Sequence, residues 1–218
     1  MNHLEDLKSI SNVGVSEMNN NIIITKYREY QEKIGSRLEL YRAVMMRYGI
    51  LSALYPGCHI DFSPSLVIPR VVYVDNFKGT INYFRQIDAF INGHKEYKQE
   101  FDVLFFGQDH TQELVVEPVD LIISQYAGFV GQATKEYPMI GGILLCNDSH
   151  GDATLSKFGE DFKLVGTIDK NNKISNSNLE DYFVLSKNRP VDLMEVKTKM
   201  KGPKYTKPAE NYLFQKLR

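Results

Sequence analysis

The chain has 218 residues, of which 43% are apolar and 24% charged, and these values are typical of a globular protein that buries a full core. No window reaches the roughly 18 consecutive apolar residues of a membrane-spanning helix, and no short apolar segment behind a basic stretch marks a signal peptide. The two cysteines, Cys58 and Cys146, are too few for a disulfide scaffold and lack the C-x-x-C spacing of a zinc site. These features predict a cytoplasmic protein with two buried thiols.

The net charge of −1 hides an uneven distribution of charge. From Lys197 to Arg218 there are seven basic residues and one acid, Glu210, so this tail carries +6 and residues 1–196 carry −7. Such a tail could bind phosphate, anionic lipid or an acidic partner. The interpretation we favour is that it folds back on its own acidic body.

The N-terminal part predicts an arm followed by a helix. Residues 1–25 are polar and rich in Asn and Ser, which is typical of a loose arm or a small cap. From Tyr27 to Tyr48 the apolar residues recur in steps of three and four, so we expect one helix there, with Gly35 as a mild cost inside it. We therefore assign residues 1–47 to an N-terminal arm and helix.

The middle of the chain alternates apolar runs with helical or polar segments. Five runs end at turn or polar residues: Ile50–Tyr55, Val71–Val74, Phe101–Phe106, Val119–Ile123 and Ile140–Cys146. Continuous apolar runs indicate strands buried on both faces, and intervening helices indicate βαβ units with a parallel sheet. Residues 48–187 are thus predicted to form one α/β domain with helices on both faces.

The end of this domain predicts a change in strand direction. The last two runs, Phe162–Ile168 and Tyr182–Ser186, are joined by a polar, Asn-rich linker with too few apolar residues for a packed helix. We therefore expect the two runs to form an antiparallel hairpin at the end of the sheet. Residues 188–218 are assigned to a basic C-terminal extension.

Three local stretches relate this pattern to a known family. Tyr73-Val74-Asp75 and Phe106-Gly107-Gln108-Asp109 are similar to the family's second and third strand ends. Pro138-Met139-Ile140-Gly141-Gly142 is similar to the Pro-Gly-Gly turn that leads into its fifth strand. With the expected order of strands, the chain resembles the Rossmann-like fold of class I S-adenosylmethionine (SAM)-dependent methyltransferases over about 140 residues.

The resemblance implies SAM as the cofactor and a set of residues that bind it. Asp75 would accept hydrogen bonds from the ribose diol and Asp109 from the adenine amine, while Gly57, Asp61 and Ser124 would complete the contacts. Each of the first two carboxylates could instead cap the segment that follows it.

The loop after the first strand differs from the family pattern. The usual motif is an acid followed by several glycines, whereas Tyr-Pro-Gly-Cys-His here contains Gly57 alone. Ser63 is a good N-cap and Pro64 suits the first helical position, but Pro69 limits the helix to about one turn. The stretches 55–65 and 147–152 are nevertheless similar to those of a group of uncharacterised bacterial methyltransferase-like proteins.

In open parallel sheets the ligand lies beyond the carboxyl ends of the strands. The ends of the fourth and fifth strands supply Gln125, Tyr126 and Asn147 as candidate substrate-binding residues. An aromatic residue such as Tyr126 could instead simply be packed.

Small and polar residues from Asn147 to Asp152 follow the fifth strand. His150 is a candidate general base for an acceptor hydroxyl or amine, with Asp148 beside it. Catechol-type methyltransferases hold a metal here with the help of an acid after the fourth strand, but this chain has Ser124 there, so we expect no metal. The alternative is that Asp148 or Ser149 caps a helix from Asp152 to Phe158.

Methyl transfer from SAM to a small-molecule acceptor is the leading functional hypothesis. The single glycine at Gly57 leaves open a non-catalytic ligand-binding or partner protein on the same fold. Nucleic-acid modification is a third hypothesis, motivated by the +6 tail. It is disfavoured because Ser124-Gln125-Tyr126-Ala127 stands where nucleic-acid amino-methyltransferases carry an Asn/Asp-Pro-Pro-Tyr/Phe tetrad.

Overall fold

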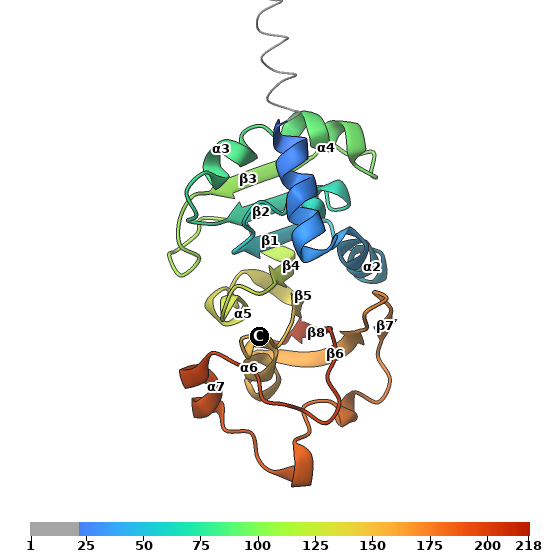
Figure 1. Ribbon diagram of the computed structural model, residues 1–218. Coiled ribbons are helices and arrows are strands. Elements are labelled where there is room, and N and C mark those ends of the chain that lie inside the picture. The colour runs from blue at the N-terminus through green and yellow to red at the C-terminus, as the bar shows by residue number, and fades with distance from the viewer. Residues whose placement is uncertain (1–21) are drawn as a thin grey trace, which may run out of the picture.

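The computed structural model describes residues 22–218 and contains an eight-stranded mixed sheet (Figure 1). The strands are β1 (Ser52–Pro56), β2 (Arg70–Val74), β3 (Asp102–Phe106), β4 (Val119–Ser124), β5 (Pro138–Cys146), β6 (Phe162–Ile168), β7 (Ile174–Ser175) and β8 (Asn211–Lys216). Their order is β3-β2-β1-β4-β5-β8-β6-β7, with β1 to β5 parallel to one another and β8 antiparallel to both its neighbours. The prediction of a mostly parallel sheet with antiparallel C-terminal strands is confirmed.

The sheet is strongly twisted. In Figure 1 the arrows of β1, β2 and β3 point to the left, whereas β6 points to the right, although the pairings run β6 in the same sense as β5. Each strand of a sheet is rotated by about 20 to 25° from its neighbour, and this rotation accumulates over eight strands. The edge formed by the carboxyl ends of the parallel strands therefore sweeps around the molecule.

Helices cover both faces of the sheet, as expected. They are a helix over 22–34, α2 (Leu38–Tyr48), α3 (Thr80–Phe84), α4 (Asp88–His94), α5 (Val130–Ala133), α6 (Asp152–Phe158) and α7 (Leu193–Lys199). One buried cluster joins the helix 22–34, α2, α3 and α4 to one face of the sheet. The second cluster joins α6 and the segment 179–209 to the other face. Between β1 and β2 the chain forms only a 3-10 turn, Ser63–Leu66, with Pro64 at its start.

The single helix predicted over Tyr27–Tyr48 is two helices. Gly35 has φ 81°, a left-handed conformation, and its N–H donates to the carbonyl of Gln31 at 2.8 Å. This geometry ends the first helix, and residues 35–37 redirect the chain before α2 begins. Glycine adopts positive φ at little cost, so Gly35 can end a helix. The apolar spacing of three and four residues continues on both sides of Gly35 and therefore does not reveal the break.

The predicted hairpin between Phe162–Ile168 and Tyr182–Ser186 is wrong. β6 pairs instead with β8, which comes from the predicted C-terminal extension and lies between β5 and β6. Phe183 has φ 62° and packs its buried ring against Tyr205 and Tyr212, so the chain turns here instead of extending into a strand. The α/β domain expected to end at residue 187 therefore leaves out β8, which is a central strand of the same sheet.

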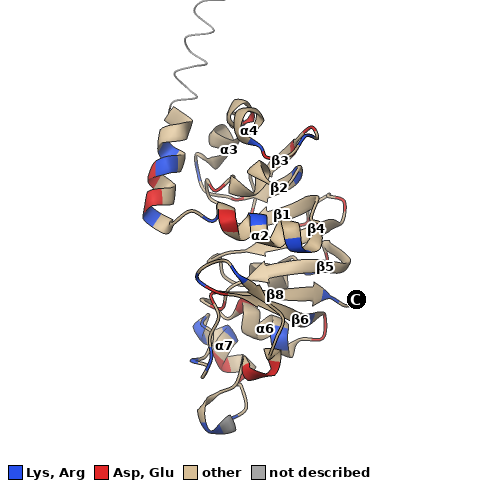
Figure 2. Cartoon of the chain, turned by 90° about the vertical axis from the view of Figure 1, so that its right-hand side faces the viewer, with Lys and Arg blue, Asp and Glu red and all other residues tan. Residues whose placement is uncertain are grey.

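The basic tail folds back on the acidic body. Four of its cations form ion pairs: Lys199 with Glu195, Lys207 with Asp181, Lys216 with Asp161, and Arg218 with Glu160. Figure 2 shows basic (blue) and acidic (red) positions of the chain interspersed over α7 and the neighbouring loops. This arrangement confirms the interpretation favoured from the sequence. No helix in the described part of the chain is both long and apolar enough to cross a membrane.

Candidate functional site

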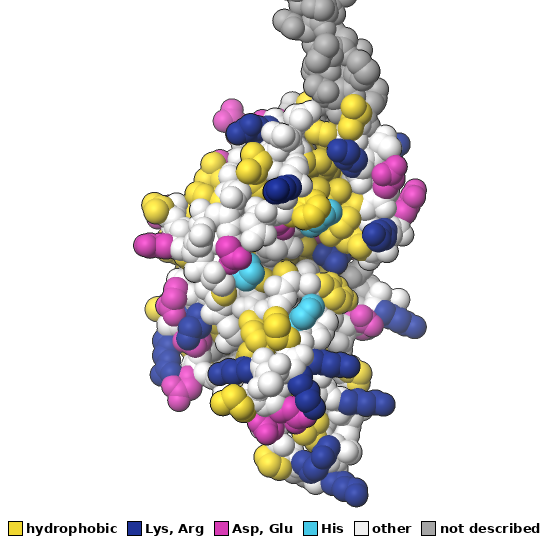
Figure 3. Space-filling view, turned by 60° about the vertical axis from the view of Figure 1, so that its left-hand side comes forward, with side chains coloured by type: hydrophobic (Ala, Val, Ile, Leu, Met, Phe, Trp, Pro, Cys, Tyr) yellow, Lys and Arg dark blue, Asp and Glu magenta, His cyan; other side chains and the backbone are white. Residues whose placement is uncertain are grey.

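The carboxyl edge of the sheet brings together most of the side chains singled out from the sequence. It consists of the carboxyl ends of β1 to β6 and the amino end of β8, which runs the other way. Figure 3 turns forward the side to which β1, β2 and β3 point. On this face histidine side chains lie among exposed hydrophobic ones, and lysine and arginine side chains gather below them.

Asp75 and Asp109 lie at the ends of the adjacent strands β2 and β3. Asp75 accepts the backbone N–H groups of His59 and Phe77, each at 2.7 Å and each on a different oxygen. Asp109 accepts from Asn76 at 3.2 Å, so the two strand ends are linked. The side-chain and backbone hydrogen bonds of Thr111 to Asp109 lower the pKa of that carboxyl.

His59 follows Gly57 and is held between two aromatic rings. Its ring centroid lies 5.1 Å from that of Tyr30, on the helix 22–34, and 5.0 Å from that of Phe77. Its backbone is left-handed, with φ 49°. The Nδ1 atom is buried without a hydrogen-bond partner. A buried polar atom without a partner is rare in native proteins, which makes this loop a candidate ligand contact.

Gly57 has φ 66°, and a Cβ added to it would overlap the Cβ of Ala127. The loops after β1 and β4 are therefore in direct contact at this glycine. The absence of a side chain at Gly57 serves the packing of two protein loops, and this space is already filled.

Asp61 is a core residue and not a surface for a ligand. The side chain is 2% exposed, and both oxygens accept hydrogen bonds: Oδ2 from Tyr41 at 3.0 Å and from Tyr55 at 3.3 Å, Oδ1 from the Ser63 hydroxyl at 2.5 Å. The guanidinium of Arg37 lies 3.8 Å away. This network corrects the assignment of Asp61 to the cofactor, because it is closed within the protein.

Ser124 also has a structural partner. Its hydroxyl is buried and donates to Oδ2 of Asp152 at 2.5 Å, and the backbone N–H of Gly131 donates to the same oxygen at 2.8 Å. Burial raises the pKa of Asp152, and these hydrogen bonds oppose that rise. The pair ties β4 to α5 and α6, so the position of Ser124 corrects its assignment to the cofactor.

Gln125 and Asn147 belong to a row of hydrogen bonds along the edge. Gln125 donates to Asn211 at 2.9 Å and accepts from Asn147 at 3.3 Å. Asn147 accepts from the hydroxyl of Ser149 at 2.6 Å, and that hydroxyl lies 3.0 Å from Nδ1 of His150. The row crosses β4, β5 and β8, and its bond to Asn211 exists because β8 inserts beside β5.

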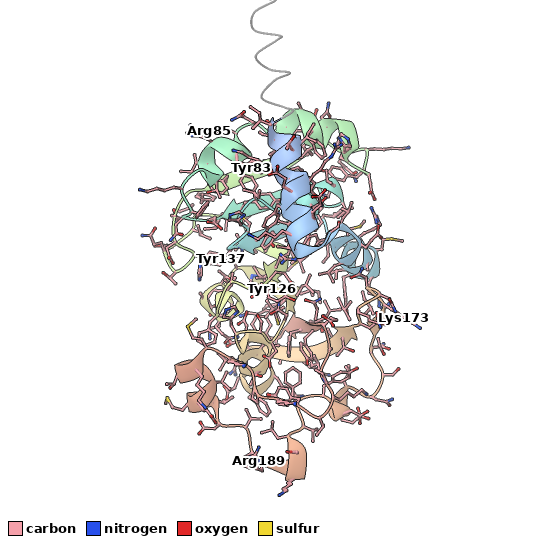
Figure 4. All side chains as sticks on the ribbon, in the orientation of Figure 1. Tyr83, Arg85, Tyr126, Tyr137, Lys173 and Arg189 are labelled. Carbon is pink, nitrogen blue, oxygen red and sulfur yellow. The ribbon has the colours of Figure 1, made fainter. Side chains whose placement is uncertain are left out.

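Tyr126 is exposed and has a strained backbone. It has φ 59° and is 57% exposed, and the guanidinium carbon of Arg37 lies 5.2 Å from the centroid of its ring. Figure 4 places Tyr126 near the centre of the molecule, between the parallel strands above and β6 and β8 below. A left-handed aromatic residue is uncommon, and such strain concentrates at functional sites.

Three cavities adjoin one another along this edge, and all three are lined in part by Glu210. The first, of about 230 Å³, we call the tyrosine cavity, because Tyr126, Tyr205 and Tyr212 contribute to its wall together with Asn147, Asp148, Ser149 and Glu210. The second, of about 260 Å³, is bordered by Arg37, Gln125, Tyr126 and Lys170. The third, of about 470 Å³, is bordered by Lys170, Lys173 and Tyr182.

Asp148 lines the tyrosine cavity, whereas His150 does not. Burial raises the pKa of Asp148 to about 6, although the hydrogen bonds from the Thr154 hydroxyl at 2.8 Å and from its N–H at 2.7 Å oppose the rise. The contact with Thr154 also anchors the start of α6, which spans the predicted residues Asp152–Phe158. Asp148 is therefore both a helix anchor and a carboxyl poised near neutrality.

Sequence reasoning missed Arg37, Tyr205 and Glu210. All three lie in segments that were assigned to the N-terminal arm or the C-terminal extension. One signal was available: Glu210 is the only acid between Lys197 and Arg218. The described residues contain no group of three or more His, Cys, Asp or Glu side chains placed to hold a metal ion.

Comparison with solved structures identifies the architecture. A methyltransferase from Geobacter sulfurreducens matches with a TM-score of 0.50 and 9% identity, over 89% of this chain and 88% of that chain. The chain has a class I methyltransferase-like fold. A SAM-dependent methyltransferase from Clostridium acetobutylicum matches at TM-score 0.48 and 9% identity over 91% of this chain and 99% of that one. The N-methyltransferase NodS from Bradyrhizobium japonicum, in complex with S-adenosylhomocysteine, matches with a TM-score of 0.44 and 14% identity, over 88% of this chain and 86% of that chain.

The likeness to these class I structures is a likeness of fold. No family model matches the sequence, and no curated protein matches it. In this chain β8 gives the sheet its antiparallel strand between β5 and β6. Function has to be argued from the residues of the carboxyl edge.

Proposed function

We propose that this chain binds SAM beside the ends of β1, β2 and β3 and transfers its methyl group to a small-molecule acceptor. The observation that supports this most strongly is the pair Asp75 and Asp109 at the ends of adjacent parallel strands. Each oxygen of Asp75 accepts one backbone N–H group, and a carboxylate offers about four acceptor positions. The remaining positions suit the two hydroxyls of a ribose.

The other groups at this end of the edge also fit a nucleoside. Nδ1 of His59 is buried and unpartnered, so it has the capacity for one more hydrogen bond. Phe77, whose ring is tilted by 42° against that of His59, is 58% exposed and offers an aromatic face. Asp109 is only partly buried and ionised, so it can accept from an exocyclic amine. SAM would supply an activated methyl group, which leaves the protein to position the acceptor and take up its proton.

Asp148 is the residue we assign to proton uptake, with Gln125, Tyr126 and Asn147 positioning the acceptor. A general base works best when its pKa is close to the working pH, and the pKa of Asp148 is about 6. Asp148 also lines the tyrosine cavity together with Tyr126 and Asn147. His150 reaches this row only through Ser149, so we give it a positioning role.

Calorimetry with SAM and with S-adenosylhomocysteine tests the proposal directly. We expect both to bind to the wild type, and we expect Asp75→Asn to weaken binding at least tenfold because ribose acceptors are lost. Asp88→Asn, on the exposed start of α4, is the matched control and should bind as the wild type does. Thermal melting of both variants shows whether the loop stays folded. Absence of binding at millimolar concentration of either compound would sink the proposal.

A non-catalytic protein on the same fold is the second candidate, and one observation favours it. The contact between Gly57 and Ala127 fills space directly beyond β1. If the filled space is the part of the site that SAM needs, SAM and its product should both fail to bind, while the cavities around Glu210 still accept a ligand. The same calorimetry therefore separates the two candidates.

A further inference from the structure

The tyrosine cavity combines aromatic walls with acidic groups and lacks basic ones. Its ten lining residues include Tyr126, Tyr205 and Tyr212 and the two acids Asp148 and Glu210, but no lysine or arginine. This composition is unexpected, because Tyr205 and Glu210 belong to a tail that otherwise carries seven basic residues. The fold thus places Glu210, the one acid of the basic tail, at this cavity, and none of the tail's cations lines it.

Glu210 has no partner for its charge among residues 22–218. Its side chain is exposed and takes part in none of the hydrogen bonds or ion pairs of that part of the chain. Two lysines of the same tail are engaged elsewhere, since Lys207 pairs with Asp181 and Lys199 with Glu195. Lys170 lines two of the three cavities together with Glu210, but the two side chains do not form an ion pair. The carboxylate of Glu210 is therefore free to act as a counter-ion for a ligand.

Glu210 lies where its charge can act on all three cavities of the edge. The residue precedes β8 and lines all three adjoining cavities, the tyrosine cavity among them. Lys170 and Lys173 line the largest of the three, and Figure 4 shows Lys173 at the far right, away from the central Tyr126. The tyrosine cavity thus carries acids and aromatic rings with no cation in its lining, whereas the largest cavity carries two lysines beside Asp169 and Glu210.

Such surroundings select a cation. Tyrosine faces attract ammonium groups through their quadrupoles, and carboxylates add Coulombic attraction. An anionic group in the same cavity would be repelled by Glu210 and by ionised Asp148. A cavity of about 230 Å³ lies below the usual range for a whole ligand, so it suits one small group of a larger molecule.

We propose that the tyrosine cavity binds the amine or ammonium group of a small organic ligand, with Glu210 as its counter-ion. The rest of that ligand extends toward the larger cavity and its lysines. If the chain is a methyltransferase, as proposed above, this amine belongs to the methyl acceptor. The amine site itself stands independently of SAM, because none of its lining residues is assigned to the cofactor.

Choline and its neutral isostere 3,3-dimethylbutan-1-ol are the probes, because they share a shape and differ in charge. In ligand-observed NMR titrations of the full chain without SAM, we expect choline to bind at least tenfold more tightly than the isostere. Glu210→Gln should weaken choline binding about tenfold and leave the isostere unchanged. Glu117→Gln, an exposed glutamate beside a cavity formed by β2 and β3, is the matched control and should change neither.

Three results would overturn the amine site: equal binding of the two probes, unchanged choline binding by Glu210→Gln, or no choline binding at millimolar concentration. A second variant, Tyr126→Leu, checks the aromatic contribution and should weaken choline more than the isostere. Failure of SAM to bind in the calorimetric test would reject the methyl transfer and leave the amine site standing. If SAM binds but choline and its isostere bind equally tightly, the amine site is rejected and the methyl-transfer proposal stands.

Discussion

The guanidinium carbon of Arg37 lies 5.2 Å from the centroid of the Tyr126 ring. The same guanidinium donates to the Tyr55 hydroxyl at 3.0 Å and lies 3.8 Å from Asp61. Arg37 thus joins a carboxylate buried in the core to the strained, exposed tyrosine of the ligand edge. The position of Tyr126 therefore depends on a charge network that reaches from the core to the wall of the second cavity.

Asp61→Ala should destabilise the protein by about 3 kcal/mol, because it leaves Arg37 and two buried tyrosine hydroxyls without their acceptor. Urea unfolding followed by circular dichroism measures this loss. The control is Glu195→Ala, which breaks an ion pair with Lys199 whose side chains are 57% and 65% exposed. That variant should lose less than about 1 kcal/mol, as surface pairs do. Equal losses in the two variants would contradict the role given to Asp61.

Gly57→Ala should be more harmful than Gly35→Ala, although both glycines are left-handed. The conformation alone costs an alanine about 1 to 2 kcal/mol at either position. Only at Gly57 does the new methyl group overlap Ala127, whereas the space at Gly35 is open. Overpacking adds about 1 to 3 kcal/mol, so the unfolding free energies should differ by at least about 1 kcal/mol.

The double variant Gly57→Ala with Ala127→Gly checks the cause of that difference. If the overlap is responsible, removing the Ala127 methyl should restore part of the stability lost in Gly57→Ala. A loss that is simply additive in the double variant would show that the loops after β1 and β4 do not touch in solution.

Asp148 should make the protein less stable as the pH rises from about 4 to about 6. Its pKa is raised from 3.8 to about 6 by burial, so the folded state holds its proton longer than the unfolded state does. Stability therefore falls as the pH passes through this window, by at most about 3 kcal/mol in the free energy of unfolding. Below pH 4 both states are protonated and the penalty vanishes.

Asp148→Asn removes this titration and keeps an acceptor for the N–H of Thr154. Relative to the wild type, the variant should therefore gain stability between pH 4 and pH 7, measured by denaturant unfolding at both values. Asp88→Asn, at the exposed start of α4, controls for the removal of a carboxylate as such. A stability difference between Asp148→Asn and wild type that does not change with pH would refute the assignment.

Leu213→Ala should cost about 2 to 5 kcal/mol, because Leu213 is fully buried in the central strand β8. Leu217 lies just beyond that strand and is 49% exposed. Leu217→Ala should therefore stay within about 0.5 kcal/mol of the wild type. Thermal unfolding of the two variants compares them directly. A small effect of Leu213→Ala would show that β8 is a detachable tail.

Local patterns in the sequence were sufficient for the parallel half of the sheet. The apolar runs that predict β1, β2 and β4 are buried, whereas the edge strand β3 is partly exposed. The parallel direction of these strands follows from their alternation with helices. The helix Asp152–Phe158 and the single 3-10 turn after Ser63 were equally readable, since caps and prolines act over a few residues. Burial of Cys58 and Cys146 also agrees with expectation.

The candidate site was only partly predictable. Asp75, Asp109, Gln125, Tyr126, Asn147 and Asp148 do lie on the carboxyl edge, because strand ends can be read from the chain. Asp61 and Ser124 face inward, toward Tyr41 and Asp152. This could not be predicted, because each partner is distant in sequence and becomes a neighbour only on folding. A pattern of residue types does not say which carboxylates are already satisfied.

By itself, the sequence determined which segments become buried strands, where they end and which polar side chains follow those ends. These features depend on hydrophobicity and backbone preference over a few residues. Only the tertiary structure decided that Asn211–Lys216 enters the sheet between β5 and β6 and that Glu210 comes to stand among three cavities. Strand pairing is a competition between distant segments for the same hydrogen-bonding edge, and it is settled by the packing of both faces at once.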